Sequence, residues 1–465
     1  MKKGMLAWGL LPTVVALAWP TMLEQLLQTA VQYIDTAMVG SLGTEATAAV
    51  GATGTLGWLV VSTIASLSVG LLSIVAQAHG AGDRSMAKAA SAQATFIILL
   101  TGSVFTAVIL SISPLVPVWM QVDENIREVA ATYFFILYIP MLPRVATIMY
   151  GTLLRSVGDT KTPMRVGVLV NVVNVVLNYF LIYPTQQVQI FSFTITTPGF
   201  GLGVVGAAIA SAVAVTIGGV LIAMVVWRHP EISPRGQSLK PNLSILKPTL
   251  KIALPNMFQR FGTSLGFVVF ASMINSLGGV STATHTIANT VESAFYIPGF
   301  GMQTAAATLT GNAVGAKDKQ GLKDLGRLII AIEVFLMILS GALLFTFAPN
   351  MVGIFSKDPA VISLGSIVLR MVAVSEPFYG VSIIIEGMLQ GAGKTMMPFI
   401  CSVSGMWGIR IIGTFITTQI FSFGLVGAWA CMIGHNLLIF CLFVPYYLRG
   451  KWNPLNNADL SENLP

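Results

Sequence analysis

The sequence predicts an all-α polytopic membrane protein with twelve transmembrane helices in two pseudo-symmetric six-helix lobes. Three observations carry this prediction: the composition, the apolar runs and an internal repeat. Of the 465 residues, 55% are hydrophobic and only 9% are charged, whereas soluble domains usually carry about 25% charged residues. So little charge would leave large apolar patches facing water, but a bilayer accepts an apolar surface. The composition therefore argues against a water-soluble enzyme, and the net charge of +7 does not imply a nucleic-acid partner.

Each predicted span is an apolar run of about 20 residues or more, the length that an α-helix needs to cross a hydrocarbon layer roughly 30 Å thick. The twelve runs lie near residues 12–40, 46–77, 90–116, 129–156, 164–184, 201–227, 249–276, 281–313, 327–348, 359–390, 398–421 and 424–448.

The positive charges predict the orientation of these spans. If the N-terminus is cytoplasmic, nineteen of the 25 Lys and Arg residues fall in inner segments, while the outer loops hold only Arg127 and Lys357. This asymmetry predicts a multi-pass protein of the cell membrane, the inner membrane in a two-membrane cell, with both termini in the cytoplasm. A cleavable signal ending at Ala16-Leu17-Ala18 is the alternative for the N-terminus, but its removal would damage the repeat described next.

An internal duplication appears when the sequence is compared with itself at one constant offset. The matched positions include Pro20 with Pro255, Gly80 with Gly315, Asp83 with Asp318, Gly158 with Gly393 and Pro163 with Pro398. The offset is kept from the first of these pairs to the last, which chance similarity between apolar helices would rarely maintain. Each repeat holds six spans, an even number, so the two copies enter the membrane in the same direction and are related by an axis along its normal.

The duplication predicts the domain organisation. We expect an N-lobe at residues 1–227, a cytoplasmic linker at 228–247 that contains three prolines, a C-lobe at 248–448 and a cytoplasmic tail at 449–465. Two halves about a central axis create a cleft, and rocking one half against the other exposes that cleft alternately to each side. This is the architecture of a transporter.

The first span carries the polar residues Glu24, Gln28 and Asp35. Glu24 and Asp35 are eleven residues apart, about three helical turns, so one helix face presents both carboxylates with Gln28 between them. Lipid cannot solvate such a face, which must point into the protein or into a wet cavity. We expect Asp35 to bind a proton or a cation, and Glu24 and Gln28 to line the substrate cavity. The alternative for Asp35 is a helix-end carboxylate that pairs with a neighbouring donor.

The fifth span offers Asn174 and Asn178, which share a helix face because they are four residues apart. Amides supply neutral oxygen ligands and donors beside a carboxylate, so both residues are candidates for the cation-coupling site. Packing between helices is the alternative role.

The eighth span carries a polar stripe of His285, Asn289, Glu292 and Tyr296, at spacings of four, three and four residues. We expect Asn289, Glu292 and Tyr296 to line the substrate cavity in the second lobe. A hydrogen-bonded structural role is favoured for His285 over titration near neutral pH.

The tenth span contains Glu376 just before Pro377, and Glu386 near its inner end. Glu376 is a further cavity candidate, and Glu386 is expected to anchor the helix. Glu333, in the ninth span, has no polar stripe around it and is expected to be structural. The alternative for Glu376 is an ion pair with an intramembrane arginine, for which the candidates are Arg144, Arg260 and Arg410.

The sequence does not support a metal site, a nucleotide-binding site or an enzymatic function. The four histidines and three cysteines lack metal-type spacing, so no metal site is expected. Gly201–Gly206 matches a dinucleotide-binding pattern without the preceding strand, and Gly393-Lys394-Thr395 lacks the first glycine of a phosphate-binding loop. We therefore expect neither an enzyme nor an organic cofactor, and no use of ATP.

Two segments resemble signatures of the multidrug and toxic compound extrusion (MATE) transporters. They are the nine residues from Asp35 to Gly43 and the loop from Gly158 to Met164, which is echoed at 393–398. With the twelve spans and the duplication, the resemblance covers essentially the whole chain. It implies a secondary antiporter that exports organic cations and amphipathic drugs in exchange for H⁺ or Na⁺, with the ion as its only cofactor and a monomer as the expected state.

The resemblance also implies roles for individual residues. Asp35 matches the aspartate of the family's first helix, whose protonation or sodium occupancy expels the drug. Asn174 and Asn178 fall where DinF-like members place an asparagine and an aspartate, so the chain looks closer to that branch but has an amide in place of the second acid. The glutamate that NorM-like members carry in helix 7 has no counterpart in residues 251–276.

Two rival functions stay open at this point. Relatives in the same superfamily move lipid-linked or polyanionic precursors, and such a flippase is the main alternative. Twelve rather than fourteen spans and the acidic character of the first span argue against it. A channel or an intramembrane enzyme is the remaining alternative, without a reactive cluster to support it.

Overall fold

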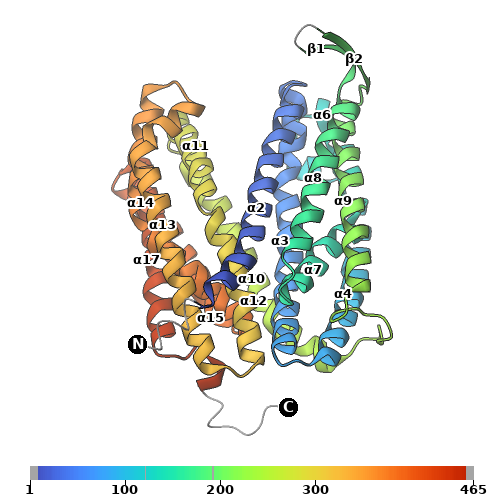
Figure 1. Cartoon of the computed structure of the whole chain (residues 1–465). Coiled ribbons are helices and arrows are strands. Elements are labelled where there is room, and N and C mark those ends of the chain that lie inside the picture. Colours follow the sequence, from blue (N-terminus) through green and yellow to red (C-terminus); the bar gives the residue numbers. More distant parts are fainter. Residues whose placement is uncertain (1–8, 121, 191–192, 457–465) are drawn as a thin grey trace. The chain divides into compact units, whose positions relative to one another are not determined.

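The computed structural model describes residues 9–120, 122–190 and 193–456, and these residues are predominantly helical (Figure 1). The helices of the first half are α2 (Leu11–Gly40), α3 (Thr44–Gly80), α4 (Arg84–Ile112), α5 (Val116–Trp119), α6 (Glu124–Tyr138), α7 (Met141–Ser156), α8 (Lys161–Ile182) and α9 (Gly203–Arg228). Those of the second half are α10 (Leu243–Asn275), α11 (Gly279–Phe295), α12 (Ile297–Gly315), α13 (Lys319–Phe355), α14 (Pro359–Gly391), α15 (Met396–Gly405), α16 (Ile412–Phe415) and α17 (Gly424–Leu448).

The helices account for the twelve predicted spans. Among the described residues, nine helices are long and apolar enough to cross a membrane, and the bent pair α6–α7 is a tenth. The other two predicted spans coincide with helices that are not among these ten: α2, whose apolar run contains Glu24 and Asp35, and α11 with α12, which meet at Tyr296. The fold is therefore the predicted all-α membrane fold with twelve transmembrane helices in two six-helix lobes.

Three spans depart from a continuous α-helix. The fourth bends by 49° between α6 and α7, where Pro140 cannot donate the backbone hydrogen bond that a helix interior requires. The eighth is divided at Tyr296 into α11 and α12, and Pro298 follows in the first turn of α12. The eleventh contains two π-helical segments, η1 (Met406–Ile411) and η2 (Ile416–Ile420).

A β-hairpin that was not predicted follows α8 (Figure 1). Its antiparallel strands are β1 (Pro184–Ile190) and β2 (Phe193–Phe200), and the register changes between Pro184 and Gln186. Polar and apolar residues alternate along 187–190 (Gln, Val, Gln, Ile), a pattern that was available in the sequence as a strand signal.

Backbone conformation repeats at the duplicated positions. The offset of the duplication relates three pairs of turn residues with positive φ, which is a conformation that L side chains rarely adopt. These pairs are Gly43 (116°) with Gly278 (99°), Gly82 (71°) with Lys317 (54°), and Gly158 (85°) with Gly393 (75°). Both repeats therefore leave their helices through the same turns.

The chain divides into two compact units. Unit 1 comprises the described parts of Met1–Met22, Leu72–Asp83 and Lys247–Pro465, and unit 2 comprises Leu23–Leu71 and Arg84–Leu246. In unit 1, α14 packs against α11, α12, α13 and α17. In unit 2, α9 packs against α6, α7 and α8. The lobe boundaries that the sequence predicts stay predictions.

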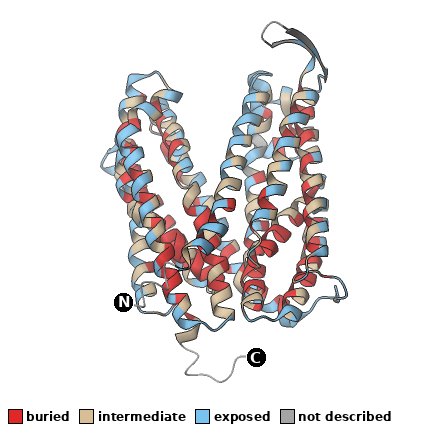
Figure 2. Ribbon diagram, in the orientation of Figure 1, coloured by how far each residue is buried: buried red, intermediate tan, exposed pale blue. Residues whose placement is uncertain are grey.

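Apolar side chains lie both inside the units and on their surface. Figure 2 marks the buried and the exposed residues along the ribbon. One core cluster of unit 1 surrounds Ile329, Met388 and Phe443, and a second surrounds Trp429. On the outside, α13 exposes Phe335, Ile338 and Leu339, and further large apolar residues are exposed on most helices. An exposed apolar helix face on this scale is typical of contact with lipid.

Candidate functional site

The candidate coupling site is a chain of hydrogen bonds inside unit 2 that links α2, α8 and α9. Asn178 in α8 donates from Nδ2 to Oδ1 of Asp35 in α2 over 2.6 Å. The same Nδ2 atom donates to Oδ1 of Asn174 over 3.2 Å, and Asn174 donates from its own Nδ2 to the Ser211 hydroxyl in α9 over 3.0 Å. The structure thus brings together the three residues that the sequence predicts for cation coupling.

Local packing explains why these side chains meet. Asn174 and Asn178 lie one helical turn apart, so both project from one face of α8. Val39, Ile182 and Ala207 form a small core cluster that holds α2, α8 and α9 together near this point. Both asparagines are almost fully buried, whereas Asp35 is partly exposed.

This arrangement suits a small, hard cation. It combines one carboxylate with two amide groups and a hydroxyl, and such cations prefer oxygen ligands. The amide donor also supports the ionised form of Asp35, because a hydrogen bond to a charged acceptor is stronger than a bond between neutral groups. A proton or a Na⁺ ion at Asp35 would have to compete with this donor.

Glu24, at the other end of the predicted stripe, is bound in an ion pair with Arg155 of α7. The Nη2 atom of Arg155 lies 2.7 Å from both carboxylate oxygens of Glu24, and only 12% of the Glu24 side chain is exposed. Gln28 lies between the two acids along α2 and is exposed. Arg155 is one of the nineteen Lys and Arg residues that the predicted orientation assigns to inner segments. An acid within a span needs a partner. This requirement was the signal in the sequence that Glu24 pairs with a cation such as Arg155.

The second predicted set lies in unit 1. Tyr296 donates its hydroxyl to Oε1 of Glu292 over 2.5 Å, and its ring meets the ring of Tyr379 in α14 edge-on at 5.0 Å. Glu292 is buried, while Asn289 on the same helix is exposed. Tyr379 is not among the predicted residues, although the sequence carried a signal for it: it lies three residues after Glu376 and seven before Glu386, on the same helix face.

Glu376 lies one turn before Tyr379 in α14, and its side chain is fully buried. Neither of its carboxyl oxygens forms a hydrogen bond of standard geometry in the part of the chain that the structure describes, but the Tyr296 hydroxyl interacts with this carboxyl group. None of the arginines considered for it forms an ion pair with it among those residues. Of these, Arg410 instead stacks over the rings of Phe267 and Phe270, at 5.1 and 5.4 Å.

The remaining intramembrane candidates are packed rather than exposed. Glu333 is fully buried against Gly299 of α12 and Gly380 of α14. Glu386 accepts hydrogen bonds from Gln259 and Gln390, at 3.1 and 3.2 Å, in line with an anchoring role.

For His285 the expected hydrogen bond is absent at Nδ1 among the described residues. Its ring lies edge-on to aromatic rings at 5.6 and 5.9 Å, those of Phe270 and Trp429.

No group of three or more His, Cys, Asp or Glu residues that could hold a metal ion occurs within the described ranges. The two predicted sets belong to different units, so a cavity common to both stays a prediction.

A protein-family model, MatE, matches this chain twice, at residues 20–180 and 255–416, which together are more than half of the chain. The two matches begin at Pro20 and Pro255, which are paired in the duplication. The chain is 27% identical over 438 residues to a protein of Thermotoga maritima named "Probable multidrug resistance protein NorM", covering 94% of this chain and 92% of the relative. It is 26% identical to "Probable multidrug resistance protein YoeA" of Bacillus subtilis, covering 88% of this chain and 87% of the relative.

Solved structures share the fold. One, described as the outward-facing conformation of a multidrug resistance MATE family transporter, superposes with a TM-score of 0.86 at 24% identity and covers 95% of this chain and 96% of that chain. Another, of a MATE protein in complex with MaL6, has a TM-score of 0.86 at 23% identity and covers 96% and 97%. At these identities the likeness establishes the fold alone.

Proposed function

Because this chain belongs to the MatE family of membrane transporters, we propose that it is a secondary active multidrug efflux antiporter. Its substrates are organic cations and amphipathic drugs, which it exports in exchange for H⁺ or Na⁺ by alternating access. The observation that carries the proposal is the bond between Asp35 and Asn178, a carboxylate in a membrane span held by a buried amide. A charge in that position is costly and is kept mainly where it has a function.

Exchange follows from competition for one negative charge. A proton or Na⁺ at Asp35 neutralises the carboxylate that an organic cation would otherwise meet. If ion and drug stabilise opposite-facing states, each can enter only after the other has left, and the coupling is limited by each ligand's preference for one state. Glu24, Gln28, Asn289, Glu292, Tyr296 and Glu376 are the proposed lining of the drug pathway.

The proposal includes the orientation of the chain in the membrane, its oligomeric state and its cofactor. Both termini and the segment from Arg228 to Lys247 face the cytoplasm, in agreement with the distribution of Lys and Arg. The transporter works as a monomer in the cell membrane, and the transported ion is its only cofactor. Asn178 in place of an acid agrees with a coupling site of one carboxylate, which suits exchange of one monovalent cation.

Purified protein in proteoliposomes tests this function directly. A fluorescent cationic dye is added, and the internal pH and the movement of ²²Na⁺ are recorded together. An antiporter moves one of the two ions in fixed proportion to the dye. Ion flow without dye would indicate a channel, and dye flow that ignores both gradients would contradict exchange.

The flippase alternative is not favoured. The relatives that match nearly the whole chain carry names of multidrug resistance proteins, and a polyanionic cargo would be repelled by the carboxylates of α2. Lipid-linked precursors in the same proteoliposomes are therefore expected to stay in their original leaflet.

A further inference from the structure

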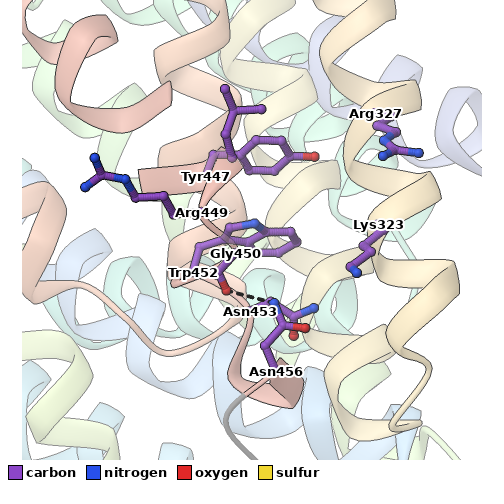
Figure 3. A pocket seen from close by; sticks show the side chains of 9 residues that line it. Lys323, Arg327, Tyr447, Arg449, Gly450, Trp452, Asn453 and Asn456 are labelled. Atoms are coloured by element: carbon purple, nitrogen blue, oxygen red, sulfur yellow. Dashed lines mark hydrogen bonds between the residues drawn. The ribbon is translucent and has the colours of Figure 1, made fainter. Parts of the chain in front are cut away.

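A pocket at one end of unit 1 has no part in the transport proposal. It lies between the first turns of α13 and the segment that follows α17, and its volume is about 310 Å³. Three of its nine lining residues are basic and none is acidic. Figure 3 shows Lys323 and Arg327 of α13 on one side, with Tyr447 and Trp452 facing them.

The chain builds this pocket through a defined turn. Gly450, with φ of 70°, reverses the chain after α17, and its carbonyl accepts hydrogen bonds from the Asn453 backbone and the Asn456 side chain at 3.2 and 3.0 Å. Lys394 donates to the Lys451 carbonyl over 2.7 Å. Trp452 is 3% exposed and stacks on Tyr447 with ring centres 5.1 Å apart. The segment is therefore docked on the helices.

One buried donor of the pocket, on Asn453, has no acceptor among the described residues. Asn453 is only 1% exposed, and its Nδ2 atom has no hydrogen-bond partner among the described residues. Its Oδ1 atom already accepts from the Leu455 backbone over 2.8 Å. Lys323 and Arg327 form no ion pair within the described part of the chain. A buried donor without a partner is costly, which indicates that a ligand supplies the acceptor.

The position of the pocket favours a particular anion. Lys323 lies in the second turn of α13, whose N-terminal end carries the positive pole of a 37-residue helix. The pocket also lies where α17 ends and α13 begins, beside the aromatic residues Tyr447 and Trp452, which suit the level of lipid headgroups. Basic pockets between transmembrane helices bind anionic headgroups.

We propose that this pocket binds the phosphate group of an anionic glycerophospholipid. Lys323 and Arg327 neutralise the phosphate charge, and Asn453 Nδ2 donates a hydrogen bond to one of its oxygens. The lipid fastens the segment after α17 to the start of α13. The site is separate from the transport proposal and holds whether or not Asp35 couples ion flow.

The test uses the full-length protein, stripped of lipid in a neutral detergent. Binding of phosphatidylglycerol and phosphatidylcholine is measured by native mass spectrometry and by the lipid-induced rise in melting temperature. We expect preferential binding of phosphatidylglycerol that weakens with salt. Lys323→Gln with Arg327→Gln should reduce its affinity about tenfold or more. Asn453→Asp, which places a carboxylate against the anion but keeps the bond to Leu455, should reduce it as well.

Lys317→Gln with Lys451→Gln is the matched control. It also removes two positive charges, one just before α13 and one just after α17, but neither of these exposed residues lines the pocket. Affinity for phosphatidylglycerol should change little in this variant. Equal losses in both double variants, or full binding after Lys323→Gln with Arg327→Gln, would overturn the proposal. If millimolar inorganic phosphate saturates the pocket, the bound phosphate comes from a free anion, and the proposal of a lipid ligand is overturned.

Discussion

Gly80 and Gly315 occupy equivalent positions in the two repeats, and each lies against the backbone of the helix that carries the other. A Cβ atom added at Gly80 would lie 1.9 Å from the carbonyl oxygen of Asn312, and one added at Gly315 would lie 1.9 Å from that of Gln77. Gln77 and Asn312 are themselves paired by the offset of the duplication. Small residues let helix backbones approach closely, so the crossing of α3 and α12 in unit 1 is built from matching parts of the two repeats.

Substitution of Gly80 or Gly315 by alanine should destabilise the protein. The added methyl group has no space and must separate the two helices, which costs about 1 to 3 kcal/mol. Thermal unfolding in detergent measures this loss. Gly353→Ala in α13 is the control, because nothing lies within 4 Å of a Cβ atom there. Equal melting temperatures for all three variants would show that the crossing tolerates separation.

Glu24→Gln should destabilise unit 2, because it leaves Arg155 mostly buried without its partner. Breaking such a pair from one side costs about 3 kcal/mol, and removing both charges costs less. Unfolding of Glu24→Gln, Arg155→Gln and the double variant completes a thermodynamic cycle. A Glu24→Gln protein as stable as the original would refute the importance of the pair. Loss of transport in a stable double variant would support the predicted place of Glu24 in the drug pathway.

Asn178→Ala should weaken ion coupling while Asp35 is retained. It removes the donor 2.6 Å from the carboxylate, and a hydrogen bond to a charged group contributes about 1.5 to 3 kcal/mol. The ion concentration that half-saturates exchange should therefore rise about tenfold or more. Asn171→Ala is the control, since this amide lies in the same helix but makes no hydrogen bond to Asp35 among those of the structure. An unchanged half-saturating concentration would remove Asn178 from the site.

Glu376→Gln and Glu333→Gln should separate a pathway residue from a packing residue. Both carboxyl groups are buried, and neither forms a hydrogen bond of standard geometry among the described residues, so an amide of equal size should cost little stability. Glu376→Gln should raise the KM for a cationic dye roughly tenfold through loss of one charge interaction. Glu333→Gln should leave KM unchanged. The reverse pattern would exchange their assigned roles.

The span positions were predictable because every helix that crosses the bilayer needs an apolar run long enough to span the hydrocarbon layer. Runs such as 424–448 and 359–390 reappear as α17 and α14 with almost the same ends. The bend at Pro140, the division at Tyr296 and the π-helical segments of the eleventh span were not predicted, since apolar length does not report local hydrogen bonding. The hairpin at 184–200 was not predicted, because its strands are too short to register as membrane-spanning runs.

At the site, spacing along one helix was informative and pairing between helices was not. The four-residue step from Asn174 to Asn178 predicted a shared face, and the structure places both in the hydrogen-bonded chain of Asp35. Arg155 and Ser211 come from other helices, and no pattern along the sequence connects them to α2 or α8. The contacts of Arg155 and Ser211 with α2 and α8 arise from the packing of helices, which the sequence alone does not show.

Gradient-driven accumulation of a cationic dye by proteoliposomes that contain Asp35→Asn tests the central claim most directly. Wild-type and variant protein are reconstituted in equal, folded amounts, and a proton or Na⁺ gradient is imposed. Exchange at one carboxylate predicts that the variant binds dye but does not accumulate it against its gradient. Accumulation by the variant at the wild-type rate would contradict the claim that Asp35 couples the two flows.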